Sequence, residues 1–274
     1  EAVEGFGFRE ATADWRKMVE HPDVEVVYVT APNMMHEELA IAAAEAGKAV
    51  FCEKPVGGKP DQTVRVDAAA RAAGVITGVG SVFHSAKVEP GSTVAVLGCG
   101  GVGLAAINGA AIAGASRIIA VDLSDEKLQM AVRFGATDTV NPGKVNAIEA
   151  VKELTKGGVH YSFECVGLKQ TAEQAYHMLR PRGVATVIGM ISPGVNIEIP
   201  GIELLATEKR LQGAIMGSNR FRVDFPRLIE LYRQGKLHLD DLVSDRIGLE
   251  GITGALQNLK DNKGTVARQV VVFD

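Results

Sequence analysis

The chain alternates between short apolar runs and longer amphipathic or Ala-rich stretches. The clearest alternation lies between Thr93 and Asp122, where two apolar runs, 93–97 and 117–121, flank an Ala-rich stretch that suits a helix. The same alternation continues with predicted strands at 160–167 and 184–190. Strands that alternate with helices indicate an α/β fold with a parallel sheet. We therefore expect a Rossmann-type, doubly wound parallel sheet in this part of the chain.

The first part of the chain shows a shorter version of the same pattern. Apolar runs predict strands at 24–30, 49–52 and 75–79, and the stretches 34–47 and 62–73 between them predict helices. Strand–helix–strand–helix–strand is half of a doubly wound sheet. The pattern therefore predicts an additional half-Rossmann α/β segment at the N-terminal end.

A glycine pattern follows the first strand of the larger predicted sheet. Gly98, Gly100 and Gly103 form G-x-G-x-x-G. In such a turn the first glycine permits a tight bend, the second lets a pyrophosphate approach the backbone, and the third lets the helix lie close to the strand. Gly101 and Val102 stand at the start of that helix, whose free N–H groups and positive dipole end favour phosphates. The order of strand, glycines and helix predicts a dinucleotide-binding site.

Asp122 ends the second strand, about 20 residues after the glycines. A carboxylate at this place accepts hydrogen bonds from the ribose hydroxyls and repels a 2′-phosphate. We therefore expect NAD rather than NADP as the cofactor. A structural turn followed by an incidental aspartate is the alternative interpretation.

Composition and charge narrow the class of protein. The chain has 274 residues, of which 46% are hydrophobic and 23% charged, as in an ordinary α/β enzyme. The net charge of −4 argues against a nucleic-acid or anionic-membrane partner. No apolar run is long enough to span a bilayer. The chain opens with Glu1 rather than Met, so we expect a trimmed start or an origin inside a longer protein.

The cysteines indicate the compartment. Cys52, Cys99 and Cys165 are far apart and form no C-x-x-C arrangement. This usage indicates a reducing, cytoplasmic environment and provides no clustered metal site. Buried thiols that act as small hydrophobic side chains are the preferred interpretation.

Residues 6–73 resemble the Gfo/Idh/MocA oxidoreductases, a family of NAD(P)-dependent sugar and inositol dehydrogenases. The resemblance is carried by Asp23 to Asn33, by His36, by Glu45 to Lys48 and by Cys52 to Pro55. In that family the matching lysine lies near the nicotinamide and the substrate hydroxyl. The resemblance therefore implies a catalytic role for Lys54, whereas a solvated lysine at a strand end is the alternative.

Residues 74–274 resemble the medium-chain, zinc-type alcohol dehydrogenases, and this match is the closer of the two. It is carried by residues 74–82, 86–91, 132–138 and the glycine pattern. The resemblance implies NAD as cofactor and hydride exchange with a small alcohol or carbonyl compound. It places Lys127 at the adenosine ribose and Arg268 at the pyrophosphate. The residues that it places around the nicotinamide half are Val166, Gly189, Met190 and Ile215.

The second resemblance also implies zinc, but the expected ligands are absent. Ala73 stands where the family has a zinc cysteine, and alanine cannot ligate a metal. His36 and His84 are the histidines best placed for another role. We expect His36 at a helix N-terminus beside a nucleotide site and His84 at the surface.

Together the resemblances divide the chain into a Gfo/Idh/MocA-like segment (1–73), an NAD-binding domain (74–218) and a tail (219–274) that resembles the end of the alcohol dehydrogenase catalytic domain. The junction at Gly74 indicates a fusion or chimera of two families, natural or engineered. The second resemblance also implies a third strand at 139–140 and a sixth, edge strand at 211–217. An unpaired apolar edge is a liability, so we expect a homodimer or a higher homo-oligomer.

Three functions stay open. The leading hypothesis is an NAD-dependent oxidoreductase of alcohol dehydrogenase type. The first alternative is a non-catalytic NAD-binding module, because the active sites of both families are incomplete here. The second alternative is a reaction of the sugar or inositol dehydrogenase kind that uses Lys54.

Overall fold

The computed structural model of the protein describes residues 10, 12–24, 26–31, 35–46, 48–52, 75–260 and 269–271. The chain separates into two compact units, Glu1–Arg71 and Ala72–Asp274. Each unit is built around its own parallel β-strands. Within the described ranges, the helices are all too short or too polar to cross a membrane.

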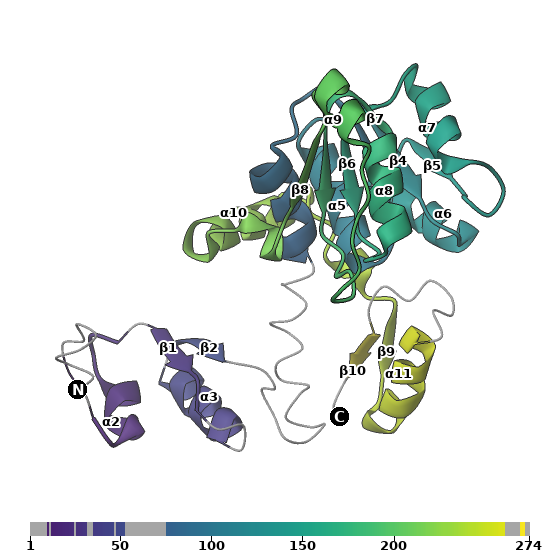
Figure 1. Ribbon diagram of the computed structural model, residues 1–274. Coiled ribbons are helices and arrows are strands. Elements are labelled where there is room, and N and C mark those ends of the chain that lie inside the picture. The colour runs from purple at the N-terminus through teal and green to yellow at the C-terminus, as the bar shows by residue number, and fades with distance from the viewer. Residues whose placement is uncertain are drawn as a thin grey trace. The chain divides into compact units, whose positions relative to one another are not determined.

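The larger unit is built on a six-stranded parallel sheet with the order β5-β4-β3-β6-β7-β8 (Figure 1). Its strands are β3 (Thr93–Leu97), β4 (Arg117–Val121), β5 (Asp138–Val140), β6 (Val159–Glu164), β7 (Leu179–Val187) and β8 (Arg210–Gly213). The chain starts at β3 in the centre, moves outward to β5 and then returns to β6 on the other side of β3. This reversal is the switch point of a doubly wound sheet, and it confirms the predicted fold class.

Two hydrophobic clusters cover the two faces of this sheet. Val94 and Val96 of β3 belong to one cluster, and Ala95 and Leu97 of the same strand belong to the other. The first cluster includes residues of α5 (Gly101–Ile112) and α6 (Asp125–Arg133), and the second includes residues of α7 (Ala147–Thr155) and α8 (Lys169–His177). Because successive side chains of a strand point to opposite faces, a sheet covered on both faces needs strands that are apolar throughout.

The segment 75–79 is helical, so the predicted strand there is wrong. Residues 75–80 form an α-helix that continues into a wider helical turn, η2 (Ser81–Ala86). A Cβ on Gly78 would lie 2.4 Å from the carbonyl oxygen of Val102, and one on Gly109 would lie 3.1 Å from the Cα of Val79. The glycines let this helix lie directly against α5. That packing outweighs the β-propensity of the segment's branched residues.

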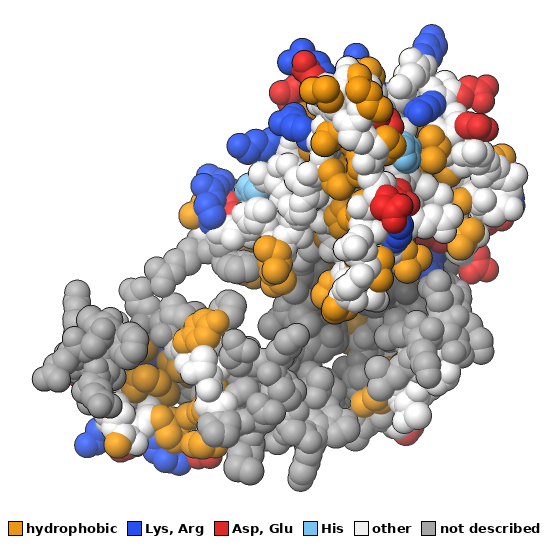
Figure 2. All heavy atoms as spheres, in the orientation of Figure 1, with side chains coloured by type: hydrophobic (Ala, Val, Ile, Leu, Met, Phe, Trp, Pro, Cys, Tyr) orange, Lys and Arg blue, Asp and Glu red, His pale blue; other side chains and the backbone are white. Residues whose placement is uncertain are grey.

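The rest of the larger unit follows β7 in the chain. These are α9 (Gly201–Thr207), η3 (Met216–Ser218), α10 (Phe221–Arg233), η4 (Asp240–Leu242), η5 (Leu249–Gly251), α11 (Ile252–Lys260) and the parallel strand pair β9 (Asp245–Ile247) and β10 (Gln269–Val271). Hydrophobic side chains form a band over the part of the surface where α9 lies (Figure 2). Ile202 and Leu205 of α9 are 75% and 76% exposed. Exposed apolar surface of this kind marks a site of interaction.

The smaller unit contains α2 (Trp15–Glu20), β1 (Val26–Val29), α3 (His36–Glu45) and β2 (Ala49–Cys52). Asp14 begins α2 by accepting a hydrogen bond from the N–H of Arg16. The two strands pair in parallel. The core of this unit consists of Val19, Val27, Val29, Leu39 and Ala43. The predicted strand–helix–strand order is therefore present, and the predicted helix at 62–73 lies outside the described residues.

Candidate nucleotide-binding site

The register of the sheet places the ends of its strands in one row. Leu97 pairs with Val121 on one side and with Glu164 on the other. Glu164 pairs with Val187, which pairs with Gly213. The loops after these residues therefore meet at the carboxyl edge of the sheet, and ligands of open α/β sheets bind at this edge beside the switch point.

The predicted cofactor residues follow those strand ends. The turn after β3 contains Gly98, Gly100, Gly101, Val102 and Gly103, the segment after β4 contains Asp122 and Lys127, and the turns after β6, β7 and β8 contain Val166, Gly189, Met190 and Ile215. The fold thus brings residues as far apart in the chain as Gly98 and Ile215 to one edge. Lys54 and Arg268 lie outside the described residues.

The glycine turn has two different sides. Gly98 has a φ of +91°, a conformation that favours glycine, and its N–H donates to the carbonyl oxygen of Val121 at 2.8 Å. A Cβ on Gly103 would lie 1.7 Å from the carbonyl oxygen of Gly98, so α5 begins in backbone contact with the strand end. A Cβ on Gly100 would meet nothing within 4 Å. The turn is closed on the sheet side and open at Gly100.

Gly100 is also the N-cap of α5 and provides no side-chain acceptor. The first N–H groups of a helix have no partner within the helix itself. Here they lie next to the open side of the turn. Such groups, together with the helix dipole, bind anions such as phosphate.

Asp122 connects β4 to the glycine turn. Its Oδ2 accepts a hydrogen bond from the N–H of Cys99 at 2.8 Å, and its Oδ1 accepts one from the N–H of Ser124 at 2.9 Å. A carboxylate has about four acceptor positions, so it can accept further hydrogen bonds. The sequence predicted only the ribose role, and the structure adds the tie to the turn.

Lys127 lies in the first turn of α6, close behind Asp122 in the chain. Ser124 caps this helix by accepting a hydrogen bond from the N–H of Lys127 at 3.3 Å. The cap fixes where α6 begins relative to the end of β4. It therefore also fixes where the side chain of Lys127 leaves the backbone.

Glu164, at the end of β6, is a site residue that the sequence analysis did not identify. Its side chain is fully buried. Its Oε1 accepts hydrogen bonds from the N–H groups of Val166 and Gly167 at 2.8 and 2.7 Å and from the Thr171 hydroxyl at 2.8 Å. An acidic residue at the end of a buried strand, followed closely by glycine, was the available signal.

The edge at the ends of β6, β7 and β8 carries exposed apolar side chains. Met190 is 94% exposed, Ile215 is 86% exposed and Val166 is 47% exposed. Large apolar side chains gathered at a binding edge fit a surface that a ligand or another protein covers.

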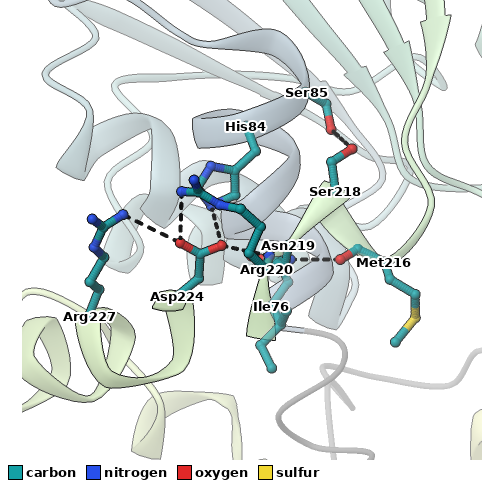
Figure 3. A network of polar contacts seen from close by, with 9 residues as sticks. All are labelled: Ile76, His84, Ser85, Met216, Ser218, Asn219, Arg220, Asp224 and Arg227. Atoms are coloured by element: carbon teal, nitrogen blue, oxygen red, sulfur yellow. Dashed lines mark hydrogen bonds and ion pairs between the residues drawn. The ribbon is translucent and has the colours of Figure 1, made fainter. Parts of the chain in front are cut away.

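A second polar cluster surrounds Asp224, near the start of α10 (Figure 3). The Asp224 side chain is only 5% exposed, and its Oδ2 lies 3.2 Å from Nε2 of His84. The N–H of Arg220 donates to Oδ2 at 2.7 Å, and the guanidinium groups of Arg220 and Arg227 lie 3.5 Å from Oδ1. Burial alone would raise the pKa of Asp224, but the hydrogen bond from Arg220 and the charges of His84 and Arg220 lower it.

The expectations for His84 and His36 have different outcomes in the structure. His84 is paired with buried Asp224 and its side chain is 22% exposed, so the expectation of a surface residue is wrong. The pairing follows from the contact between η2 and α10, which are far apart in the chain. His36 is the first residue of α3, as expected, and its side chain lies outside the described part of the structure.

The described residues do not fit a zinc site. Cys99 and Cys165 are free thiols. Burial raises the pKa of both, and the carboxylates of Asp122 and Glu164 raise it further at Cys99 and Cys165 respectively. Zinc binds the thiolate rather than the thiol. Within the described ranges, groups of three or more His, Cys, Asp and Glu that could hold a metal ion are absent.

Two family models match the chain. Residues 101–234 match the family model of the zinc-binding dehydrogenases. Residues 1–81 match the model of an oxidoreductase family with an NAD-binding Rossmann fold, Gfo/Idh/MocA. Both resemblances seen in the sequence are therefore confirmed.

Two individual relatives illustrate the similarity to dehydrogenases. The chain is 39% identical over 192 residues to a probable S-(hydroxymethyl)glutathione dehydrogenase 1 of Schizosaccharomyces pombe, covering 69% of this chain and 50% of that protein. It is 38% identical over 194 residues to alcohol dehydrogenase-like 7 of Arabidopsis thaliana, with the same coverage of 69% and 50%. The chain thus spans about half the length of the curated relatives that it matches.

Solved structures show the same likeness. Benzyl alcohol dehydrogenase from Acinetobacter calcoaceticus aligns with a TM-score of 0.71 and 31% identity, covering 74% of this chain and 56% of that one. An alcohol dehydrogenase zinc-binding domain protein from Burkholderia ambifaria aligns with a TM-score of 0.69 and 33% identity, covering 73% and 54%.

Proposed function

We propose that this chain, whose residues 101–234 match the family model of the zinc-binding dehydrogenases, binds NAD(H) at the carboxyl edge of its larger sheet. We further propose that it takes part in hydride transfer between that cofactor and a small alcohol or carbonyl compound. One observation carries the proposal. The glycine turn is closed by backbone contact between Gly98 and Gly103 and is open at Gly100, which begins a helix.

The open side of the turn suits a pyrophosphate. Its oxygens would accept hydrogen bonds from the N–H groups of the first turn of α5, which Gly100 leaves without a side-chain partner. A side chain at position 100 would fill the space that the phosphates need. The proposed role of Arg268 at the same pyrophosphate follows from the family resemblance alone.

Asp122 suits the adenosine ribose. Its carboxylate is held by two backbone N–H groups and keeps further acceptor positions for the hydroxyls. The negative charge would repel a 2′-phosphate, which favours NAD over NADP. Lys127, one helical turn beyond Ser124, is proposed to reach the same ribose.

At the other end of the edge, the segments with Val166, Gly189, Met190 and Ile215 are proposed to hold the nicotinamide. When bound, NAD supplies the hydride acceptor. We propose that backbone groups of these segments orient the nicotinamide ring and that their exposed apolar side chains exclude water. Hydride transfer needs a ring that is held in a fixed position away from water.

The two alternative functions rest on different observations. The described residues do not fit zinc, so nothing in them takes the metal's role toward an alcohol, and a non-catalytic NAD-binding module is the second candidate. A sugar-dehydrogenase-like reaction through Lys54 is the third, and it rests on the family match of residues 1–81. The three-part domain division, the fusion of two families, the homo-oligomer and the cytoplasmic location remain predictions.

A fluorescence titration with NADH tests the binding proposal, and NADPH serves as its comparison. Turnover is then followed by NADH absorbance with NAD and simple primary and secondary alcohols, with added zinc and with a chelator. Absence of NADH binding would overturn the proposal. Binding without turnover favours the non-catalytic module, and chelator-resistant turnover that Lys54→Ala abolishes favours the sugar-dehydrogenase reaction.

A further inference from the structure

We propose that Glu164 is a positioning residue that sets the two turns beside the nicotinamide half of the cofactor. The inference rests on the proposed NAD(H) binding and adds to it a residue that does not touch the ligand. Glu164 is fully buried at the end of β6, between the glycine turn and β7.

The side chain of Glu164 fixes the turn after β6. Oε1 accepts hydrogen bonds from the backbone N–H groups of Val166 and Gly167 and from the Thr171 hydroxyl, all at 2.7 to 2.8 Å. Two of these donors belong to the turn itself, and the third belongs to α8, the helix that follows. One buried oxygen therefore sets the direction in which Val166 leaves the sheet.

The backbone of Glu164 fixes the turn after β7. Its carbonyl oxygen accepts hydrogen bonds from the N–H groups of Ile188 and Gly189 at 2.9 and 3.0 Å. The same residue is thus tied to both segments that we place at the nicotinamide, one through its side chain and one through its main chain.

The turns after β6 and β7 are also in direct backbone contact, with no space for a side chain between them. A Cβ on Gly167 would lie 2.7 Å from the carbonyl oxygen of Met190, and one on Gly189 would lie 2.2 Å from the backbone nitrogen of Gly167. Because the contact is backbone against backbone, a shift of the first turn moves the second. Both Val166 and Met190 then follow the position of Glu164.

Packing does not explain why the second carboxylate oxygen of Glu164, Oε2, is buried. Oε2 is buried and has no hydrogen-bond partner within the described residues. It faces the space at Gly189, where an added Cβ would lie 2.6 Å away. A buried acceptor without a partner weakens a fold. Residues that oppose stability in this way are typical of functional sites.

The adenosine side of the edge has hydrogen bonds of its own, although Gly98 also packs against the turn after β6, where an added Cβ would lie 2.7 Å from Cγ2 of Val166. Asp122 is held by Cys99 and Ser124, and Gly100 begins α5. The hydrogen bonds of Glu164 go to the turns after β6 and β7 and to α8. The inference therefore predicts that a change at Glu164 affects ligands with a nicotinamide and spares ADP, which has only the adenosine and the two phosphates.

The experiment compares NADH and ADP binding by isothermal titration calorimetry in the full chain. Glu164→Ala removes the acceptor and should weaken NADH about tenfold or more, with ADP affinity unchanged within about twofold. Glu164→Gln keeps an acceptor oxygen and should recover most of the NADH affinity. Ser162→Ala is the matched control, because its buried hydroxyl on the same strand donates to Ala175 and not to the turns.

The outcomes separate the two proposals. If the unmodified chain binds neither ligand, the proposed function fails. If it binds both, and Glu164→Ala weakens both equally or neither, the positioning role is overturned while the proposed function stands. Should Glu164→Ala not fold, Thr171→Val replaces it. Thr171→Val removes one donor and should weaken NADH about threefold without affecting ADP, and equal effects on both ligands would again overturn the inference.

Discussion

The carbonyl oxygen of Gly98 occupies the place where a side chain on Gly103 would begin. A Cβ added to Gly103 would lie 1.7 Å from that oxygen, well inside the contact distance of any two atoms. The third glycine of the motif is thus a requirement of the fold, because α5 starts against the end of β3. The second glycine, Gly100, has open space beside it, so the fold itself does not require a glycine there, and the proposed function assigns it to the ligand.

Gly103→Ala should therefore destabilise the protein. The carbonyl oxygen in the way belongs to the backbone and cannot rotate away as a side chain can. The free energy of unfolding should therefore fall by at least the usual cost of overpacking, about 1–3 kcal/mol. Urea unfolding followed by circular dichroism measures the effect. Gly100→Ala, three residues earlier in the same motif, is the matched control, and it should leave the unfolding midpoint unchanged. Equal stability of both variants would show that the backbone contact can relax.

Gly100→Val should give the opposite result, with an intact fold and no NADH binding. The backbone of Gly100, with φ −78° and ψ −173°, is extended and accepts a β-branched residue without strain. The valine side chain would fill the space that the phosphates need. An NADH titration together with the unfolding curve checks both halves of the prediction. Retained affinity would mean that this turn does not hold the phosphates.

The parts of the fold that local pattern determines could be predicted from the sequence. The apolar run at 93–97 is β3 with the same bounds, and the glycine turn and Asp122 lie where the strand–helix–strand order predicted. These features depend on residues that are near one another in the chain, so their periodicity carries the information.

The features that depend on distant residues could not be predicted. The segment 75–79 has the β-branched composition of a strand, yet contact with α5 makes it a helix. The pairing of His84 with Asp224 joins residues 140 positions apart. Glu164 reads as the last residue of a strand, and its role emerges only when β6 and β7 lie side by side. Tertiary packing decides each of these cases.

Asp122→Ala should weaken NAD binding more than NADP binding. The change removes the acceptor for the ribose hydroxyls, and hydrogen bonds to a charged group are worth about 1.5–3 kcal/mol. It also removes the tie to Cys99, so both cofactors should lose some affinity. For NADP the loss is offset, because the charge that repels its 2′-phosphate disappears.

Titration of both reduced cofactors against the variant measures this difference in affinity. Asp125→Ala is the control, since that carboxylate lies nearby but pairs with Lys144 and Asn141. It should change both affinities little and equally. A loss of the same size for both cofactors in Asp122→Ala would contradict the assignment of NAD.

The apolar surface near the edge of the sheet should mediate self-association. β8 is the last strand on its side of the sheet, and the adjacent α9 exposes Ile202 and Leu205. Unpaired strand edges and exposed apolar patches both favour contact between copies. The double change Ile202→Asp and Leu205→Asp should reduce the mass observed by analytical ultracentrifugation to that of one chain. Val195→Asp, at another exposed apolar residue, is the control. A monomeric unmodified chain would refute the prediction.

The cluster around Asp224 should make stability depend on pH in the acid range. Burial opposes the charge of Asp224, but the Arg220 N–H and the charges of His84 and Arg220 lower its pKa below the ordinary value, with Arg227 also in contact. A carboxyl group whose pKa is lower in the folded state stabilises the fold above the unfolded-state pKa, about 3.9. That contribution is lost as the pH falls through the lower, folded-state pKa.

Asp224→Asn should therefore lower the free energy of unfolding near pH 7 by about 1–3 kcal/mol, because hydrogen bonds to a charged group are replaced by weaker ones. The difference from the unmodified chain should persist down to about pH 4 and shrink at lower pH, where the aspartate becomes neutral as well. Urea unfolding at a series of pH values measures the difference. Glu153→Gln, a change of an exposed carboxylate on α7, is the control. A difference for Asp224→Asn that stays constant down to the acid unfolding of the chain would show that the charge of Asp224 does not stabilise the contact between η2 and α10.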